Sequence, residues 1–111
     1  MMPSINVEQT TSDMLAAAKL VFGDKWPEVK KFAESESKKF AENMLEIEKW
    51  KKDGDISESE AISLSKLHQR SMKMVFTALE GISLAIAEKA INAALDVVRS
   101  AVNTAIGWPV I

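Results

Sequence analysis

Three ionisable residues interrupt apolar stretches of helical spacing: Glu36, His68 and Glu80. A carboxylate or an imidazole withdrawn from water needs a charged or hydrogen-bonding partner, and such groups often mark catalytic or metal sites. These three residues are therefore the candidate metal ligands of the chain. Counted from the turn expected near residue 54, they lie at levels separated by a helical turn or more. One chain is not expected to gather them into a cluster.

The segment KKDGDISESEA, residues 51–61, resembles a calcium-binding loop in its Asp-Gly-Asp and its downstream glutamate. With Gly54 as the turn glycine of an EF-hand, Glu60 falls at the position of the bidentate glutamate. Lys49 and Lys51 then stand where two carboxylates should neutralise the ion. The segment is better interpreted as the connector between two helices.

Other catalytic and metal motifs fit the sequence poorly. A di-iron bundle requires Glu-x-x-His, but the single histidine, His68, follows Ser65 in SKLH. The chain has no cysteine for zinc binding or thiol catalysis. No serine lies in a glycine-framed turn, and no glycine-rich loop could hold a phosphate. We therefore predict no catalytic residue, no bound metal and no cofactor, and a protein that is not an enzyme.

Helices are the elements that must position these residues. A loose lead-in is expected over 1–11, followed by a helix over 12–22 that Ser12 caps and Gly23 ends. The following helices are expected over 24–52, capped by Asp24, and over 57–106, before a tail over 107–111. Ser57, with Glu60 three residues later, predicts a capping box at the start of the last helix. The fold class is all-α, with a single domain over 1–111.

Composition bounds the class of protein. A chain of 111 residues with 47% hydrophobic content is sufficient for one small globular domain. Its net charge is −2 with both signs interleaved, so we predict no nucleic-acid partner. The first residues lack the basic and apolar regions of a signal peptide. The longest uncharged stretch has about twelve residues, fewer than the roughly twenty that span a bilayer. A cytoplasmic location is expected.

The two long helices differ in length. They have about 28 and about 48 residues and would extend roughly 42 and 72 Å, so an antiparallel hairpin leaves the end of the second helix unpaired. That end is also the most apolar part of the chain. Either a second copy covers it in a homodimeric bundle, which we favour, or the helix breaks near Gly81 and folds back. The expected interface residues are Leu84, Ile91, Leu95, Val98, Val102, Ile106 and Trp108.

The leading functional prediction is a non-enzymatic helical bundle that acts through self-association and protein–protein interaction. Trp108, in the apolar ending GWPVI, either tucks over the core or anchors the tail in a protein partner. The alternative is that the C-terminal amphipathic helix lies on a lipid surface, although its polar side lacks the expected excess of lysine. A metal-binding bundle is the third possibility.

Overall fold

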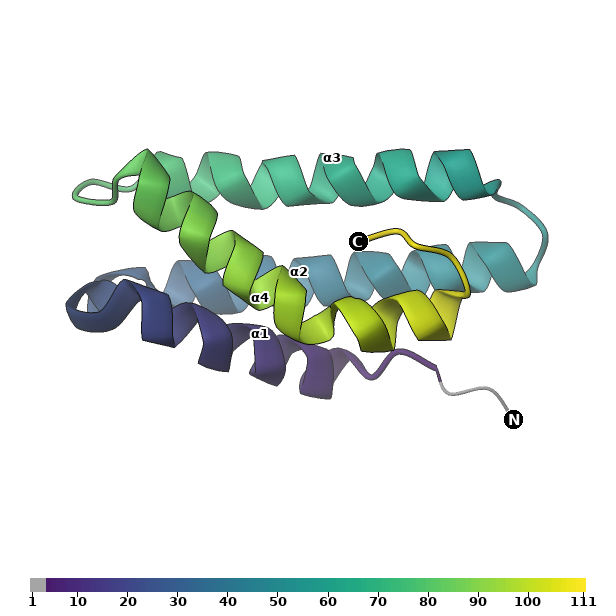
Figure 1. Ribbon diagram of the computed structural model, residues 1–111, viewed down its shortest axis with the longest axis horizontal. Coiled ribbons are helices and arrows are strands. Elements are labelled where there is room, and N and C mark those ends of the chain that lie inside the picture. The colour runs from purple at the N-terminus through teal and green to yellow at the C-terminus, as the bar shows by residue number, and fades with distance from the viewer. Residues whose placement is uncertain (1–3) are drawn as a thin grey trace.

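The computed structural model describes residues 4–111, which form four α-helices and one short 3-10 turn (Figure 1). The elements are α1 (Val7–Phe22), η1 (Gly23–Lys25), α2 (Trp26–Lys52), α3 (Glu58–Thr77) and α4 (Leu84–Ile106). The all-α fold class expected from the helical spacing is confirmed. None of these helices is both long and apolar enough to cross a membrane.

The helices form an elongated bundle of 43 × 24 × 18 Å. Successive helices run in opposite directions, and α4 crosses obliquely from α3 to α1, passing over α2 (Figure 1). The α1–α2 and α3–α4 turns lie at one end, and the α2–α3 turn lies at the other. The core lies between the four helices, with Met14, Phe40, Met44 and Ile47 fully buried.

The turn between α2 and α3 follows its prediction. The helix α2 ends at Lys52, and Gly54 takes a left-handed conformation with φ of 75°. The Ser57 hydroxyl accepts a hydrogen bond from the Glu60 amide at 3.1 Å, and the Glu60 carboxylate accepts one from the Ser57 amide at 2.9 Å. The predicted capping box is therefore present, and it accounts for the glutamate that made the segment resemble a calcium loop.

The first helix begins earlier than expected. Asn6 caps α1, since its side chain accepts a hydrogen bond from the Gln9 amide at 2.9 Å, so residues 7–11 are helical. The expected start at Ser12 is wrong because asparagine caps a helix as well as serine does. Thr10 and Thr11 have low helix propensity, so the sequence gives little sign that the helix already includes them. Residues 1–3 of the expected lead-in lie outside the described residues.

The join between α1 and α2 was predicted only in part. Gly23 ends α1 as expected, with φ of 52°. Asp24 does not cap α2 but lies within η1, and no side chain caps the α2 start at Trp26. Pro27 occupies the first turn of α2, where its missing N–H would have no helical partner in any case. A tight 3-10 connection takes the place of a capped start.

The favoured continuous helix over 57–106 is wrong, and the alternative, a break near Gly81 that folds the chain back, is correct. The helix α3 ends at Thr77, and α4 begins at Leu84 after a reversal of the chain. Gly81 has φ of 78°, a conformation that glycine adopts at little cost. Two residues later, the Ser83 hydroxyl accepts a hydrogen bond from the Ile86 amide at 3.2 Å and caps α4. Gly81 allows the chain to turn after α3, and Ser83 caps the start of α4. The two residues together make the turn, which glycine alone would not.

Because α4 folds back, the chain buries most of its own predicted interface. Ile91, Leu95, Val98, Val102 and Ile106 are between 1% and 7% exposed within a single chain. Leu84 is 55% exposed and Trp108 is half-buried. The long helix with an unpaired C-terminal end, which would have required a second chain to cover it, is not present within residues 4–111. Those five residues pack in the core of the single chain instead. Self-association itself stays a prediction.

The tail folds back over the end of the bundle. The Asn103 side-chain oxygen accepts hydrogen bonds from the amides of Val110 and Ile111, both at 3.0 Å. Val110 is buried, and the Lys51 ammonium lies 4.6 Å from the centre of the Trp108 ring. The same ammonium donates a hydrogen bond to the Ile106 carbonyl at the end of α4. The tail over 107–111 therefore packs over the core in this structure, as in the first of the two predicted arrangements.

Replacing Gly81 with alanine tests the reversal. In the observed turn, the new methyl group meets only the Lys25 ammonium at 3.5 Å, so the cost is conformational. We expect the free energy of unfolding to fall by about 1–2 kcal/mol, the cost of a left-handed conformation for a residue with a Cβ. Urea denaturation measures the change, and Gly81→Asn should lose less. A rise in stability would indicate a continuous helix, in which alanine is better than glycine by about 1 kcal/mol.

Candidate functional site

Two of the three candidate ligands come together. Glu36 and His68 line one cavity of about 50 Å³ between α2 and α3, together with Lys39, Phe40, Asn43, Ser71 and Met72. Both side chains reach this cavity although the residues are expected at levels about one helical turn of 5.4 Å apart, because their long side chains can span that distance. The cavity is large enough for a water molecule or two and too small for an organic substrate.

The partners of Glu36 and His68 give both residues a packing role. Glu36 is 7% exposed, and its carboxylate lies 3.3 Å from the Lys39 ammonium. Burial lowers the pKa of His68, which favours the neutral ring, and the ring Nδ1 lies at hydrogen-bond distance, 3.1 Å, from the side-chain amide nitrogen of Asn43. Within residues 4–111, no three His, Asp or Glu side chains are placed to hold a metal ion.

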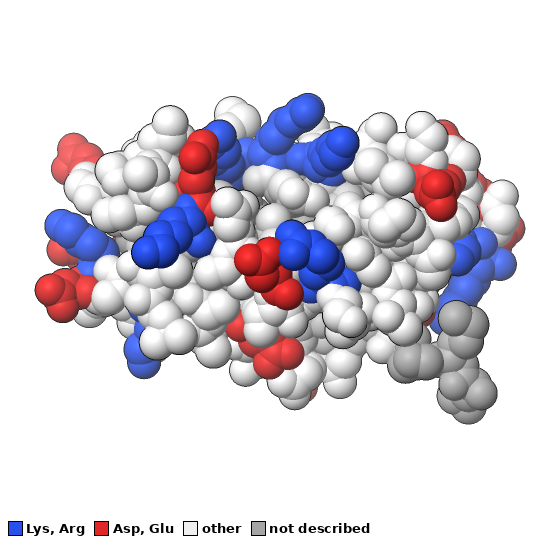
Figure 2. All heavy atoms as spheres, in the orientation of Figure 1, with Lys and Arg blue, Asp and Glu red and all other residues white. Residues whose placement is uncertain are grey.

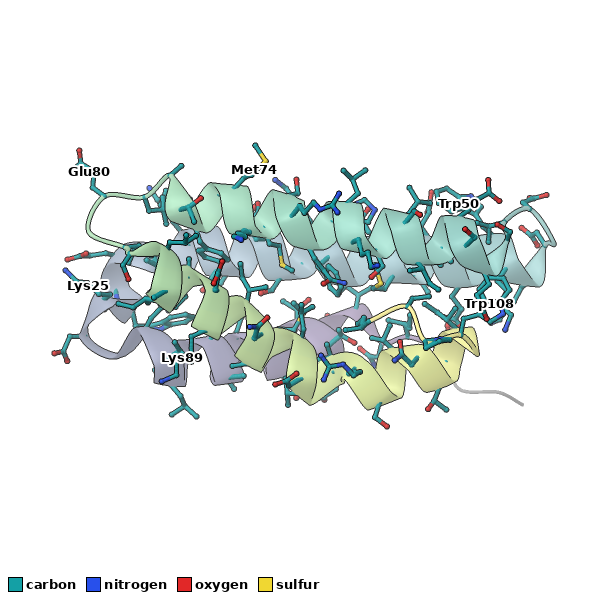
Figure 3. The ribbon with its side chains drawn as sticks, turned by 45° about the horizontal axis from the view of Figure 1, so that its top comes forward. Lys25, Trp50, Met74, Glu80, Lys89 and Trp108 are labelled. Carbon is teal, nitrogen blue, oxygen red and sulfur yellow. The ribbon has the colours of Figure 1, made fainter. Side chains whose placement is uncertain are left out.

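Glu80 lies far from this cavity. It is exposed in the turn between α3 and α4, and its side chain points into solvent at the tip of the bundle (Figure 3). Its assignment to an apolar helix face is wrong because α3 ends at Thr77, before residue 80 could extend that face.

Sequence reasoning missed the most deeply buried carboxylate, Glu48, which is 2% exposed. It accepts hydrogen bonds from the Ser4 hydroxyl at 3.0 Å and the Ile5 amide at 2.9 Å, and it pairs with the Lys52 ammonium at 3.2 Å. The spacing of Glu48 and Lys52 fits a surface ion pair, and no local signal shows that the segment before α1 covers it. Glu48 fastens that segment to α2.

The buried carboxylate of Glu48 should make the free energy of unfolding depend on pH. Burial alone would raise its pKa, but the bonds from Ile5 and Ser4 and the Lys52 ammonium outweigh burial and hold the pKa below its usual value. Its stabilising contribution is complete above the unfolded pKa, near 4.3, and is lost as the pH falls through the folded pKa.

We expect Glu48→Gln to cost roughly 1–3 kcal/mol at neutral pH. The loss of stability on acidification from about pH 7 to about pH 3.5 should be smaller in this variant than in the parent. Urea unfolding at both pH values measures the difference. Glu46→Gln, an exposed change two residues away on α2, is the control. Equal acid sensitivity of the parent and Glu48→Gln would contradict the assignment.

A surface groove of about 290 Å³ runs between α3 and α4. We call it the cationic groove, and its lining residues are Lys66, Gln69, Arg70, Lys73, Glu88, Ile91, Asn92 and Leu95. The apolar residues come from the buried side of α4, whereas the cations all come from α3. The groove therefore has an apolar floor and a positive rim along one side.

The part of α3 that follows Glu60 differs in charge from the rest of the chain. Residues 61–79 contain three cations and no acid, whereas the other residues carry all sixteen acids and eleven of the fourteen cations. Figure 2 shows Lys and Arg gathered over the middle of α3. Lys73 pairs with Glu88 at 2.8 Å, but Lys66 and Arg70 have no acidic partner within residues 4–111. A negative net charge thus coexists with a local positive surface.

Exposed apolar side chains lie beside these cations. Leu67 is 55% exposed and Met74 is 71% exposed. Figure 3 shows Met74 pointing away from the bundle. We call Lys66, Leu67, Arg70, Lys73 and Met74 the α3 face. It combines apolar area with unpaired positive charge, which suits binding to another surface rather than catalysis. The signals for it in the sequence were the absence of acids over 61–79 and the position of Leu67 and Met74 off the buried stripe.

Comparison of the chain with protein-family models, with curated proteins and with solved structures gave no match.

Proposed function

We propose that this chain is a non-enzymatic binding module that works by protein–protein interaction through the α3 face. The observation that carries the proposal is the combination, on one side of one helix, of Leu67 and Met74 with unpaired cations. Solvent-exposed apolar side chains next to charges of one sign provide both contact area and the means to select a partner. The ionisable residues of the interior are engaged by their neighbours and support packing.

The partner that this surface suits is a different chain. A symmetric dimer places the same patch of both copies in contact. Two α3 faces brought together would oppose Lys66, Arg70 and Lys73 with three identical cations, and like charges at an interface are unfavourable. The interaction surface is therefore α3 and not the C-terminal residues, and its partner is a different chain.

The lipid-surface alternative has less support. It relied on the apolar side of the helix after residue 82. Most of those side chains belong to α4 and are buried in the core of the bundle. Membrane binding by an amphipathic helix scales with the apolar area that it can insert. The α3 face has two large exposed apolar side chains, which is a small area for insertion.

A photo-crosslinking amino acid placed at Leu67 tests the proposed function. The matched control is the same substitution at Leu20, a leucine of α1 that is 87% exposed. We expect irradiation in cells of the source organism to give a discrete protein adduct from position 67 and none from position 20. The adduct is identified by mass spectrometry, and the partner is then purified.

The purified partner must bind the unmodified chain and bind Met74→Glu at least about tenfold more weakly. Sedimentation equilibrium of the chain alone completes the test, because it measures self-association separately. Equal adducts from both positions, or no protein adduct from position 67, would contradict the proposed function. An adduct between two copies of this chain would replace the heterologous partner with self-association.

A further inference from the structure

We infer that the partner segment is an acidic amphipathic helix that lies along α3, an inference that rests on the proposed function. The first step is the charge of the rim. Lys66 and Arg70 are four residues apart, so their side chains follow one another at about 6 Å along the helix axis. Neither has an acidic partner within residues 4–111, and both are exposed. Carboxylates at i and i+4 of a neighbouring helix repeat at the same interval.

The second step is the apolar spacing. Leu67 and Met74 are seven residues apart, which corresponds to about 10 Å and to two turns of helix. A partner helix with apolar residues at i, i+3 or i+4, and i+7 presents its side chains at this interval. Two turns are therefore the shortest segment that reaches both residues while also meeting Lys66 and Arg70. A partner of three to four turns covers the α3 face from Lys66 to Met74.

The third step is the groove itself. Its rim carries the amides of Gln69 and Asn92 as well as the cations, and its floor is formed by Ile91 and Leu95. Of the three cations, only Lys73 is partly neutralised, by Glu88. A carboxylate that enters the groove therefore finds charged donors on the α3 side, and on the α4 side the Asn92 amide and Glu88, whose charge is paired with Lys73. Lysine and arginine on a partner would find the same side chains repulsive, which makes the site selective for acids.

Other anionic macromolecules suit the surface less well. Nucleic acids are bound through many phosphates by domains with a basic surface, whereas this chain offers three neighbouring cations and a net charge of −2. The exposed Leu67 and Met74 would gain nothing from a phosphate backbone. An anionic membrane would satisfy the cations but needs a larger apolar area for insertion. An acidic amphipathic helix uses both features of the α3 face.

The test uses a labelled synthetic peptide of about 16 residues, long enough for four turns, with leucines on one side and glutamates flanking them. Fluorescence anisotropy measures its binding to the unmodified chain. We expect saturable binding that weakens with added salt, and no binding of the peptide in which lysines replace the glutamates. Lys66→Glu and Arg70→Glu should each weaken binding at least about tenfold.

Lys89→Glu is the matched control, because Lys89 is an exposed lysine of α4 that does not line the groove (Figure 3). It should change binding less than about twofold. Circular dichroism confirms that each variant remains helical. Equal weakening by Lys89→Glu would mean that the peptide responds only to net charge, and it would overturn the inference.

Vesicles of phosphatidylserine and phosphatidylcholine, and a single-stranded RNA, are titrated in the same way. Tighter binding of either than of the acidic peptide, with loss in Lys66→Glu and Arg70→Glu, would assign the surface to lipid or to nucleic acid and overturn the inference. A crosslinked partner at position 67 that lacks an acidic helix at the site of attachment would also overturn it, while leaving the proposed function intact. Absence of any position-specific protein adduct would remove the proposed function as well.

Discussion

Phe40→Ala should lower the free energy of unfolding by about 3–5 kcal/mol, the usual cost of emptying a buried aromatic site. Phe40 is 1% exposed on α2 and lines the small cavity that holds Glu36 and His68. Removal of the ring enlarges a space that already contains polar groups, and the packed helices on either side limit its collapse. Equilibrium urea unfolding, followed by far-ultraviolet circular dichroism, gives the change.

Leu67→Ala is the control for this measurement. Leu67 is exposed, so its truncation should change the free energy of unfolding by less than about 0.5 kcal/mol. This result would also show that Leu67 contributes little to packing or stability and is free to serve binding. A loss at Leu67 comparable to that at Phe40 would mean that α3 is rotated about its axis, with its outer side turned into the core.

Val98→Asp should cost about 3–5 kcal/mol, because it places an unpaired charge in the interior of the bundle. Val98 is 3% exposed on α4, and this burial depends on the reversal of the chain at Gly81. The loss should be the same at about 5 µM and at about 500 µM protein, since a single chain supplies all the contacts.

Val97→Asp is the matched control, because Val97 is adjacent in sequence but 51% exposed. It should change the free energy of unfolding by less than about 0.5 kcal/mol. A loss in Val98→Asp that depends on protein concentration would show that a second chain covers α4 and would contradict the folded-back bundle. Together, the two valines distinguish burial within one chain from burial between chains.

Local signals predicted the local features of the fold. Ser57 with Glu60 gave the start of α3, and Gly23 gave the end of α1, because capping is decided by residues within one turn of each other. Gly81 alone does not predict the reversal, which also needs the Ser83 cap two residues later. The placement of α4 against α1 is a tertiary contact between distant segments, and periodicity in one helix does not state which neighbour buries it.

The candidate site shows the same division. Sequence reasoning selected Glu36 and His68 because they interrupt apolar stretches, and the structure places both beside one cavity. It did not select Lys66, Leu67 and Met74. The acid-free stretch over 61–79 is visible in the sequence, but which of its residues stay exposed depends on how α3 packs in the bundle. Glu48 was missed for a related reason, since the segment that buries it lies more than forty residues away in sequence.

The last turn of α2 holds both segments by which the chain enters and leaves the bundle. Glu48 binds residues 4 and 5, and Lys51 binds the end of α4 at Ile106. A force that separates these two segments would therefore act first on attachments three residues apart, before it reached the helices in the core. The helices would peel away in succession rather than resist together in shear. The bundle is therefore expected to open under tension from this end, with the α3 face keeping its shape until the contacts of Glu48 and Lys51 have broken.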